Sequence, residues 1–287
     1  MEFLSPTTLD EALAAMAEHP DAVPILGGTD VMVELNFDRR RPPALLDLTR
    51  VEELATWDRV GEEVRLGAGV TYARVIDELA TELPGLALAS RTVGSPQIRN
   101  RGTVGGNLGA ASPAGDSHPA LLAAFADVEL SSPGGVRRLP AHEFYTGPKR
   151  HAGRPDELVT AVWVRAATGP QQFSKIGTRN AMVIAVAAFG LALHPDRRSV
   201  GTGIGSAGPT PRRATEAEEL LAAELDWEHR GEVSDTVAAE FGRLVAAAAA
   251  PIDDVRGTAA YRRHALAVMA RRCLGWAWAD HRRGEAA

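Results

Sequence analysis

The chain has 287 residues, of which 45% are hydrophobic, and carries a formal net charge of −6. A chain of this length buries about 75% of its unfolded surface, which allows one large domain or two medium ones with a full core. The acidic balance and the lack of a long basic run argue against nucleic acid as the main partner.

Short apolar segments and a single cysteine exclude several further classes. The longest apolar stretch, residues 182–193, is too short to span a bilayer. This short stretch predicts no transmembrane segment. Residues 1–6 lack the basic and apolar regions of a signal peptide, so we expect a cytoplasmic protein. Cys273, alone in the sequence, excludes an internal disulfide and any all-cysteine metal or iron–sulfur centre built from this chain alone. We expect it to be a buried structural thiol within a helix.

The first part of the chain is predicted to alternate short strands and helices. Thr8 and Glu11 fit a capping box, which predicts a helix from Leu9 to about His19. A strand at 22–26 leads into a glycine pair, and residues 31–33 leave it as an extended or helical segment, without the Rossmann glycine spacing. The further elements expected before residue 165 are strands at 45–48, 64–66 and 158–164, helices at 72–83, 86–93 and 119–125, and a hairpin of 128–131 with 135–139.

Composition shifts near residues 166–170, where a linker is predicted. We therefore expect one domain over 1–168 and a second over 169–287. The second is predicted to contain strands at 171–176, 181–193 and 199–205 of an antiparallel sheet, followed by helices at 215–223, 233–250 and 258–281. Strands followed by helices indicate an α+β fold.

The first of two glycine-rich motifs is Leu26-Gly27-Gly28-Thr29-Asp30. Backbone N–H groups exposed at such a turn form a concavity that binds anions, and the Thr29 hydroxyl adds a donor. Asp30 would repel a phosphate, so we expect it to hold the shape of the loop or to cap a helix. An ordinary tight turn explains this motif equally well.

The second motif is richer in polar groups and is predicted to be a loop. It runs from Thr103-Val104-Gly105-Gly106-Asn107 to Ala111-Ser112-Pro113-Ala114-Gly115-Asp116. Its glycine pair lets the backbone approach a ligand and adopt positive φ. Asn107 donates and accepts hydrogen bonds, and Asp116 suits a ribose or ribityl hydroxyl. The alternative is an Ω-loop that packs on itself. Two such motifs indicate that two segments of the chain bind one long anionic ligand, such as a dinucleotide.

Two lysines and several arginines are further candidates. Lys149 and Lys175 are the only lysines, and a lysine at 175 in an arginine-dominated chain favours a site for a compact ammonium over a solvated strand residue. Arg179 is expected to pair with a carboxylate or a partner subunit. The arginine pairs 262–263 and 271–272 are expected on a solvated or partner-facing side of the last helix.

Other chemistries find no support in the sequence. The histidines are scattered without an H-x-x-x-H pair, which argues against a zinc site. Ser112 lacks the G-x-S-x-G context of a hydrolase nucleophile. A P-loop motif is absent, which argues against nucleotide hydrolysis.

With these residues in view, the chain resembles the flavoprotein (medium) subunit of the molybdenum hydroxylases, the family of carbon monoxide dehydrogenase and xanthine dehydrogenase. The resemblance covers nearly the whole chain. Its motifs are Ile25-Leu26-Gly27-Gly28-Thr29-Asp30, the segment from Thr103 to Asp116, Phe144-Tyr145-Thr146-Gly147-Pro148 with Asp156-Glu157-Leu158, Phe173-x-Lys175-x-x-x-Arg179, Gly208-Pro209-Thr210-Pro211-Arg212, and Asp254-x-Arg256-Gly257-x-Ala259-x-Tyr261-Arg262.

The resemblance implies an FAD domain of the vanillyl-alcohol-oxidase-like (PCMH) type with two α+β subdomains. A small α+β domain with a three-stranded antiparallel sheet and helices follows it. The chain would supply no catalytic residue and no metal ligand of its own. The FAD-binding residues that the resemblance implies are Ile25, Leu26, Gly27, Gly28, Thr29, Asp30, Val31, Thr103, Val104, Gly105, Gly106, Asn107, Asp116, Leu158 and Lys175.

The resemblance also implies a role in electron transfer. Electrons would pass from the [2Fe–2S] clusters of a small partner subunit through FAD to NAD, a quinone or oxygen, while a large molybdopterin-binding subunit oxidises the substrate. The assembly expected is a dimer of heterotrimers. The alternatives are a self-sufficient FAD-dependent oxidoreductase acting on its own small substrate, and a scaffold that has lost its flavin. One branch of the family carries an iron–sulfur cluster in this subunit, and a chain with Cys273 alone does not belong to that branch.

Overall fold

The structure of the protein is a computed structural model that describes residues 1–284. It begins with a small parallel sheet in the order β1-β3-β2, made of β1 (Glu2–Leu4), β3 (Ala44–Asp47) and β2 (Val23–Ile25). Helix α1 (Leu9–Glu18) packs beside it, and the predicted capping box is confirmed, because the Thr8 hydroxyl accepts from the Glu11 N–H at 3.2 Å. Helix α2 (Val31–Asn36) follows the first glycine-rich motif, and a 3₁₀ turn (η1, Glu52–Leu54) follows the sheet.

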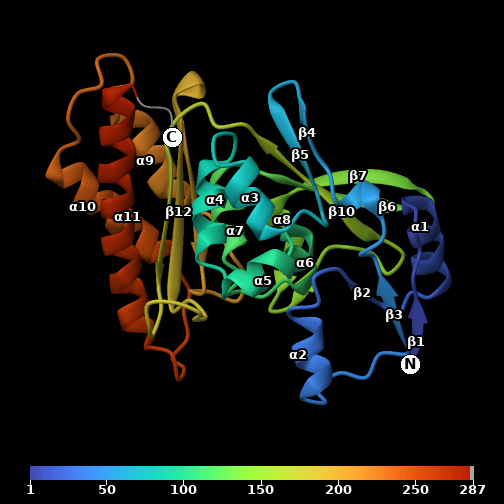
Figure 1. Cartoon of the computed structure of the whole chain (residues 1–287). Helices are drawn as coiled ribbons and strands as arrows, with labels where there is room; N and C mark the ends of the chain where they lie inside the picture. Colours follow the sequence, from blue (N-terminus) through green and yellow to red (C-terminus); the bar gives the residue numbers. More distant parts are fainter. Residues whose placement is uncertain (285–287) are drawn as a thin grey trace.

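A five-stranded antiparallel sheet forms the middle of the molecule (Figure 1). Its order is β4 (Trp57–Val60), β5 (Glu63–Gly67), β10 (Leu158–Arg165), β6 (Asp127–Ser132) and β7 (Gly135–Pro140). The predicted hairpin of β6 and β7 is confirmed. Strand β4 was not predicted from the sequence, because Asp58, Arg59 and Val60 are all exposed and show no alternation of apolar and polar residues.

Short helices and one small hairpin pack against this sheet around a shared hydrophobic core. They are α3 (Tyr72–Glu78), α4 (Pro84–Arg91), α5 (Pro96–Arg101), α6 (Val104–Ala110), α7 (Ser117–Ala123), α8 (Ala141–Phe144), and the pair β8 (Tyr145–Gly147) and β9 (Arg150–His151). The single helix expected over 72–83 is wrong in its length, since α3 ends at Glu78 and a new helix starts at Pro84.

The prediction of a continuous loop from Thr103 to Asp116 is wrong, because α6 occupies its first half. The Thr103 hydroxyl accepts from the Gly106 N–H at 3.0 Å and caps the helix. Neither Gly105 nor Gly106 has a positive φ; the helix instead ends at Ala111, which does. Gly105 is needed for packing, since a Cβ there would lie 2.3 Å from the Cβ of Ala68. Tertiary packing therefore overrides the low helix propensity of the glycine pair.

The second half of the chain is a three-stranded antiparallel sheet with helices on one face, as expected. The sheet order is β11 (Gln171–Ile176), β12 (Ala187–His194) and β13 (Ser199–Gly205), with a 3₁₀ turn (η2, Pro195–Arg197) between the last two. Strand β12 starts later than the predicted residue 181. The helices are α9 (Thr215–Glu224), α10 (Asp235–Ala248) and α11 (Ala259–Arg283). Cys273 on α11 is fully buried, which confirms its structural role.

Arg262 is buried rather than solvated, contrary to the prediction for the arginine pairs of the last helix. Its side chain is 2% exposed, donates to the carbonyls of Val186 and Ser206 at 2.9 and 2.6 Å, and pairs with Asp254 at 2.5 Å. Val186 precedes β12 and Ser206 follows β13, so the guanidinium satisfies carbonyl groups just outside the two strands.

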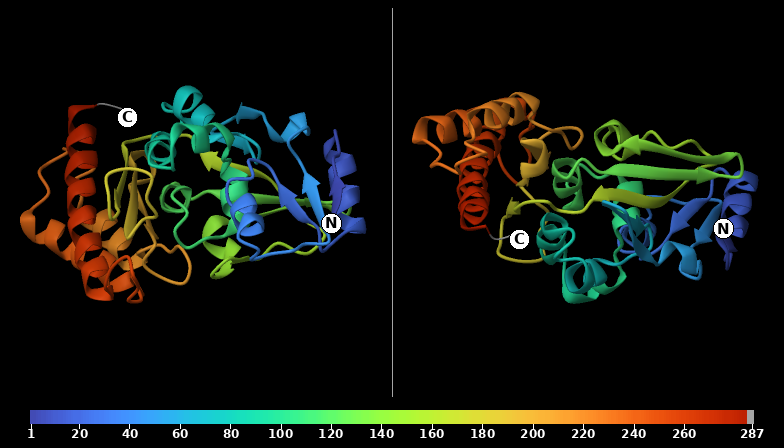
Figure 2. Two further views of the ribbon diagram at one scale, coloured as in Figure 1. Left: turned by 60° about the horizontal axis from the view of Figure 1, so that its bottom comes forward. Right: turned by 90° about the horizontal axis from the view of Figure 1, so that it is seen from above.

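Helix α7 packs on the face of the small sheet opposite α11, so the two halves of the chain are joined closely (Figure 2). Glycines on β13 allow this approach. A Cβ on Gly203 would lie 2.0 Å from the Pro119 carbonyl oxygen, and one on Gly201 would lie 1.9 Å from that of Ala123. The backbone of α7 therefore rests directly on the sheet, and this brings β11 to the start of α7. Within residues 1–284, no helix is both long and apolar enough to cross a membrane.

Candidate functional site: a nucleotide-binding junction

The two glycine-rich motifs, far apart in the sequence, meet in the structure. A Cβ on Gly27 would lie 1.9 Å from the Arg101 carbonyl oxygen and 3.0 Å from the Cα of Gly102. Thr103, the first residue of the second motif, follows at once. Any side chain at position 27 would push the two segments apart. Gly27 is therefore required for the close approach, and Gly28, at φ +73°, is required for the turn itself.

Backbone N–H groups on the first motif are free to bind an anion. Among residues 1–284, the N–H groups of Gly27, Gly28, Thr29 and Asp30 donate no hydrogen bond. The Gly28 carbonyl instead faces α2, since it accepts from the Met32 N–H at 3.0 Å. Asp30 takes the position before α2, but its side chain makes no capping bond. Consecutive free N–H groups at a turn form an anion-binding concavity.

The second motif contributes a closely packed backbone rather than free donors. The Gly105 N–H donates to the Ala68 carbonyl at 3.1 Å, and the Gly106 N–H donates to the Thr103 hydroxyl. Asn107 Oδ1 accepts from the Ser117 hydroxyl at 2.6 Å. Gly106 is exposed, and a Cβ there would meet only the Thr103 hydroxyl, at 2.9 Å. The missing side chain leaves the first turn of α6 open to a ligand.

Asp116 and Lys175 form a buried ion pair across the two halves of the chain. The Lys175 Nζ lies 2.6 Å from Asp116 Oδ2, and the two side chains are 7% and 10% exposed. Lys175 also donates to the Thr92 carbonyl at 3.1 Å. Burial raises the pKa of the Asp116 carboxyl, although the lysine opposes this shift. Asp116 Oδ1 has no partner among the described residues, so it remains available to a hydrogen-bond donor of a ligand. Lys175 is therefore not a solvated strand residue.

A buried histidine and two tyrosines beside this pair were missed in the sequence. The Tyr145 hydroxyl and His118 Nδ1 lie 2.7 Å apart. His118 is fully buried, and desolvation lowers its pKa to about 3, so the imidazole is neutral. The Tyr72 hydroxyl and His118 Nε2 have no partner within residues 1–284. The one available signal was the position of His118 two residues after Asp116, at the start of a helix.

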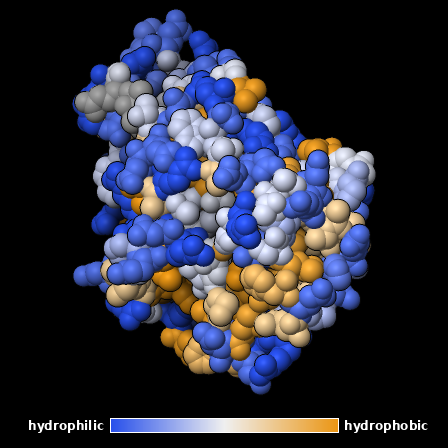
Figure 3. Space-filling view, turned by 45° about the vertical axis from the view of Figure 1, so that its right-hand side comes forward, coloured by the Kyte–Doolittle hydropathy of each residue, from blue (hydrophilic) through white to orange (hydrophobic). Residues whose placement is uncertain are grey.

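The apolar residues expected in the site lie around the first motif. Leu158, at the start of β10, is buried in the core cluster under the parallel sheet, and Leu26 packs against that cluster. Ile25 and Val31 are half-buried on either side of the turn. Helix α2, at the bottom of Figure 1, exposes Met32 and Val33, and Phe37 directly after it is exposed as well. Figure 3 shows apolar side chains gathering on the lower part of the same side.

These features together fit an elongated ligand with an anionic centre. The free N–H groups would bind the anion, and Asp116 Oδ1 would accept from a polar group further along. Within residues 1–284, no group of three or more histidine, cysteine, aspartate or glutamate side chains could hold a metal ion.

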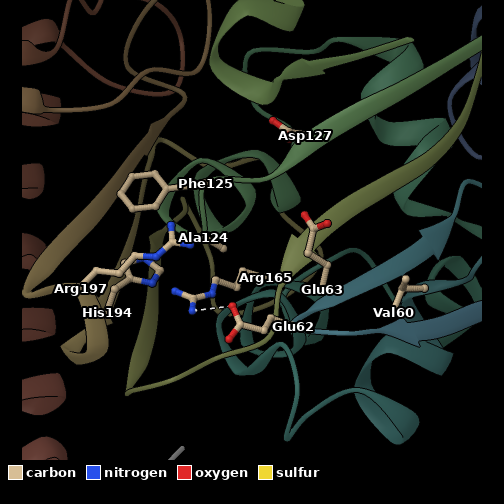
Figure 4. A pocket seen from close by; sticks show the side chains of 9 residues that line it. All are labelled: Val60, Glu62, Glu63, Ala124, Phe125, Asp127, Arg165, His194 and Arg197. Atoms are coloured by element: carbon tan, nitrogen blue, oxygen red, sulfur yellow. Dashed lines mark hydrogen bonds and ion pairs between the residues drawn. The ribbon is translucent and has the colours of Figure 1, made fainter. Parts of the chain in front are cut away.

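A separate groove of about 490 Å³ lies where β4, β10 and β12 end and β5 begins (Figure 4). It contains none of the predicted site residues. Arg165 in this groove pairs with Glu62 at 2.9 Å and with Asp196 at 2.6 Å. Because Arg165 is already neutralised by these two carboxylates, we interpret the groove as a structural charge network rather than a binding site.

Comparisons with known proteins agree with this geometry. Residues 1–164 match the family described as the FAD binding domain in molybdopterin dehydrogenase, and residues 172–277 match the CO dehydrogenase flavoprotein C-terminal domain. The nicotinate dehydrogenase FAD-subunit of Eubacterium barkeri is 34% identical over 77% of this chain and 79% of its own length. The carbon monoxide dehydrogenase medium chain of Afipia carboxidovorans is 30% identical over 95% of each chain. In a structure of carbon monoxide dehydrogenase from Hydrogenophaga pseudoflava, one chain aligns with a TM-score of 0.89 at 26% identity, covering 97% of both.

Proposed function

Because the chain belongs to the family of FAD-binding subunits of molybdenum hydroxylases, we propose that it relays electrons within such a complex. FAD is its cofactor, and its relatives are oxidoreductase subunits of the carbon monoxide and xanthine dehydrogenase type. The observation that carries the proposal is the junction of the two glycine-rich motifs, where four successive N–H groups have no hydrogen-bond partner in the described part of the chain.

The residues of the junction would hold FAD as follows. The N–H groups of residues 27–30 bind the diphosphate, and the open first turn of α6, residues 103–107, contacts it from the other side. Asp116 and Lys175 contact polar groups nearer the flavin, with Asp116 Oδ1 as the acceptor. The side chains that would line the cofactor are Ile25, Leu26, Val31 and Leu158.

When bound, FAD supplies the redox chemistry, and the chain's own residues provide binding and electrostatics. The Lys175 ammonium is held in a poorly solvated site, where its charge acts on its surroundings more strongly than in water. Its partner Asp116 fixes the position of that charge. Because Lys175 lies on β11 and Asp116 precedes α7, the same pair joins the predicted domains 1–168 and 169–287 at the site.

We propose the partners that the family architecture implies. A small subunit with [2Fe–2S] clusters would deliver electrons, and a large molybdopterin-binding subunit would oxidise the substrate, in a cytoplasmic dimer of heterotrimers. The acceptor would be NAD, a quinone or oxygen. Support comes from a relative that is itself described as a medium chain. The exposed Met32, Val33 and Phe37 beside the site also form the kind of apolar surface that a partner subunit covers.

The substitution Gly27→Ala tests the proposal, because its Cβ would collide with the Arg101 carbonyl. We expect the purified wild-type chain to be yellow and to release FAD on denaturation, and the variant to lose most of its flavin. Gly109→Ala is the matched control: it lies in α6, where a Cβ meets nothing within 4 Å, and should retain the flavin. A Gly27→Ala protein with full flavin content would refute the assignment of the junction. Turnover of a substrate by the isolated chain would favour a self-sufficient oxidoreductase instead.

A further inference from the structure

The hairpin of residues 145–151, which we call the clasp, contacts the second glycine-rich motif and α2, the helix that follows the first motif. It contains β8, β9 and the turn between them. Lys149 lies at this turn with a φ of 55°, a left-handed conformation that is uncommon for a residue other than glycine. The function proposed above assigns no task to Lys149, although it is one of only two lysines in the chain.

Two hydrogen bonds attach the clasp to the second motif. The Lys149 N–H donates to the carbonyl of Ala111, the residue that ends α6, at 3.1 Å. The Tyr145 hydroxyl bonds to His118. The imidazole in turn supports the loop before Asp116, because a Cβ on Gly115 would lie 2.2 Å from His118 Nε2. The clasp therefore supports the loop of residues 111–116 at both of its ends.

An ion pair attaches the clasp to α2, the helix that follows the first motif. The Lys149 Nζ lies 2.5 Å from Glu34 Oε1, with side chains 54% and 20% exposed. Glu34 is on α2, and its N–H donates to the Asp30 carbonyl at 3.2 Å. The helix is thus hydrogen-bonded to the turn that carries the free N–H groups. Arg40 also faces Glu34, but at the longer distance of 4.0 Å.

We propose that Lys149 is a latch: by joining Glu34 on α2, the helix that follows the first motif, to Ala111 of the second motif, it keeps the junction closed around a bound dinucleotide and slows its release. This inference rests on the proposed function. Lys149 acts through the two motifs and is a positioning residue. The latch is expected to affect the dissociation rate of FAD, because release requires the two motifs to separate.

The test measures the rate at which FAD leaves the purified holoprotein after dilution, followed by the rise in flavin fluorescence. Lys149→Gly removes the ammonium and suits the positive φ, so the backbone bond to Ala111 is kept. Lys149→Gln is a second neutral variant that keeps most of the side chain. Since a partly exposed ion pair contributes modestly, we expect both variants to release FAD about three- to fivefold faster. Lys149→Glu, which repels Glu34, should release it about tenfold faster.

Three controls distinguish a latch from a general loss of structure. The double variant Lys149→Glu/Glu34→Lys restores the pair in reverse and should return the rate to within about twofold of the wild type. Arg150→Ala, on the same hairpin and without an ion pair in the described residues, should leave the rate unchanged. Added salt should accelerate release from the wild type but have little effect on Lys149→Gly, because it screens the pair.

The outcomes separate this inference from the proposed function. A yellow wild type whose Lys149 variants release FAD at the wild-type rate would overturn the latch and leave the flavin assignment intact. Failure of the reversed pair to slow release would overturn it as well. A wild-type chain that carries no FAD under any condition would refute the proposed function, and the latch with it.

Discussion

Loss of the lysine from the buried Asp116–Lys175 pair should destabilise the protein strongly. The Nζ–Oδ2 distance is 2.6 Å, and both side chains are at least nine-tenths buried. Lys175→Met leaves a carboxylate in a poorly solvated site with no cation beside it. Breaking such a pair from one side costs about 3–5 kcal/mol in the free energy of unfolding.

The destabilisation caused by Lys175→Met should depend on pH in a defined direction. Burial already raises the pKa of Asp116 in the folded chain, and Lys175 opposes that shift, so removing the lysine raises it further. A carboxyl whose pKa is higher in the folded state than in the unfolded state destabilises the fold as pH rises through the folded value. Lys175→Met should therefore lose the most stability at pH 7–8. This loss of stability should become smaller on acidification, because Asp116 then takes up a proton.

Urea unfolding of the apoprotein at pH 7.5 and pH 5 measures this effect. The double variant Lys175→Met/Asp116→Leu, which removes both charges, should recover most of the stability at pH 7.5. An equal loss for Lys175→Met at both pH values, or no recovery in the double variant, would refute the electrostatic reasoning. The loss would then be a matter of packing.

Three further predictions concern the structure around the site. Tyr145→Phe leaves His118 Nδ1 without a partner in a fully buried place and should cost about 1–3 kcal/mol in urea unfolding, whereas Tyr261→Phe, which is 48% exposed, should cost little. Gly203→Ala puts a Cβ 2.0 Å from the Pro119 carbonyl and should destabilise by about 1–3 kcal/mol or more, whereas Gly275→Ala, in open space on α11, should stabilise by about 0.5–1 kcal/mol. His118 has a pKa of about 3 in the folded chain, below that of an unfolded histidine, so the free energy of unfolding should fall as pH drops from about 6.5 toward 3. His118→Phe should make this fall less steep, by up to the slope that the uptake of one proton on unfolding produces. An unchanged slope in this variant would mean that the imidazole is not buried in its neutral form.

Much of the local structure could be predicted from the sequence, because its signals lie within a few residues of each other. Thr8 and Glu11 are three residues apart, and their capping box defines the start of α1. The turn at Pro133-Gly134 likewise defines the hairpin of β6 and β7. The residues of the glycine-rich motifs and of four further segments also carry the resemblance to the family and its cofactor, since these motifs can be recognised without knowing how they lie in space.

Only the tertiary structure decided what each motif contributes. Gly105 and Gly106 were predicted in a loop, but contact with Ala68 places them in a helix, so the free N–H groups belong to Gly27–Asp30 instead. Lys175 and Asp116 are partners only because glycines on β12 and β13 let α7 rest on the small sheet. Such contacts join residues far apart in the chain and depend on close packing of whole elements. No local propensity or spacing encodes them, and they determine where a ligand can bind.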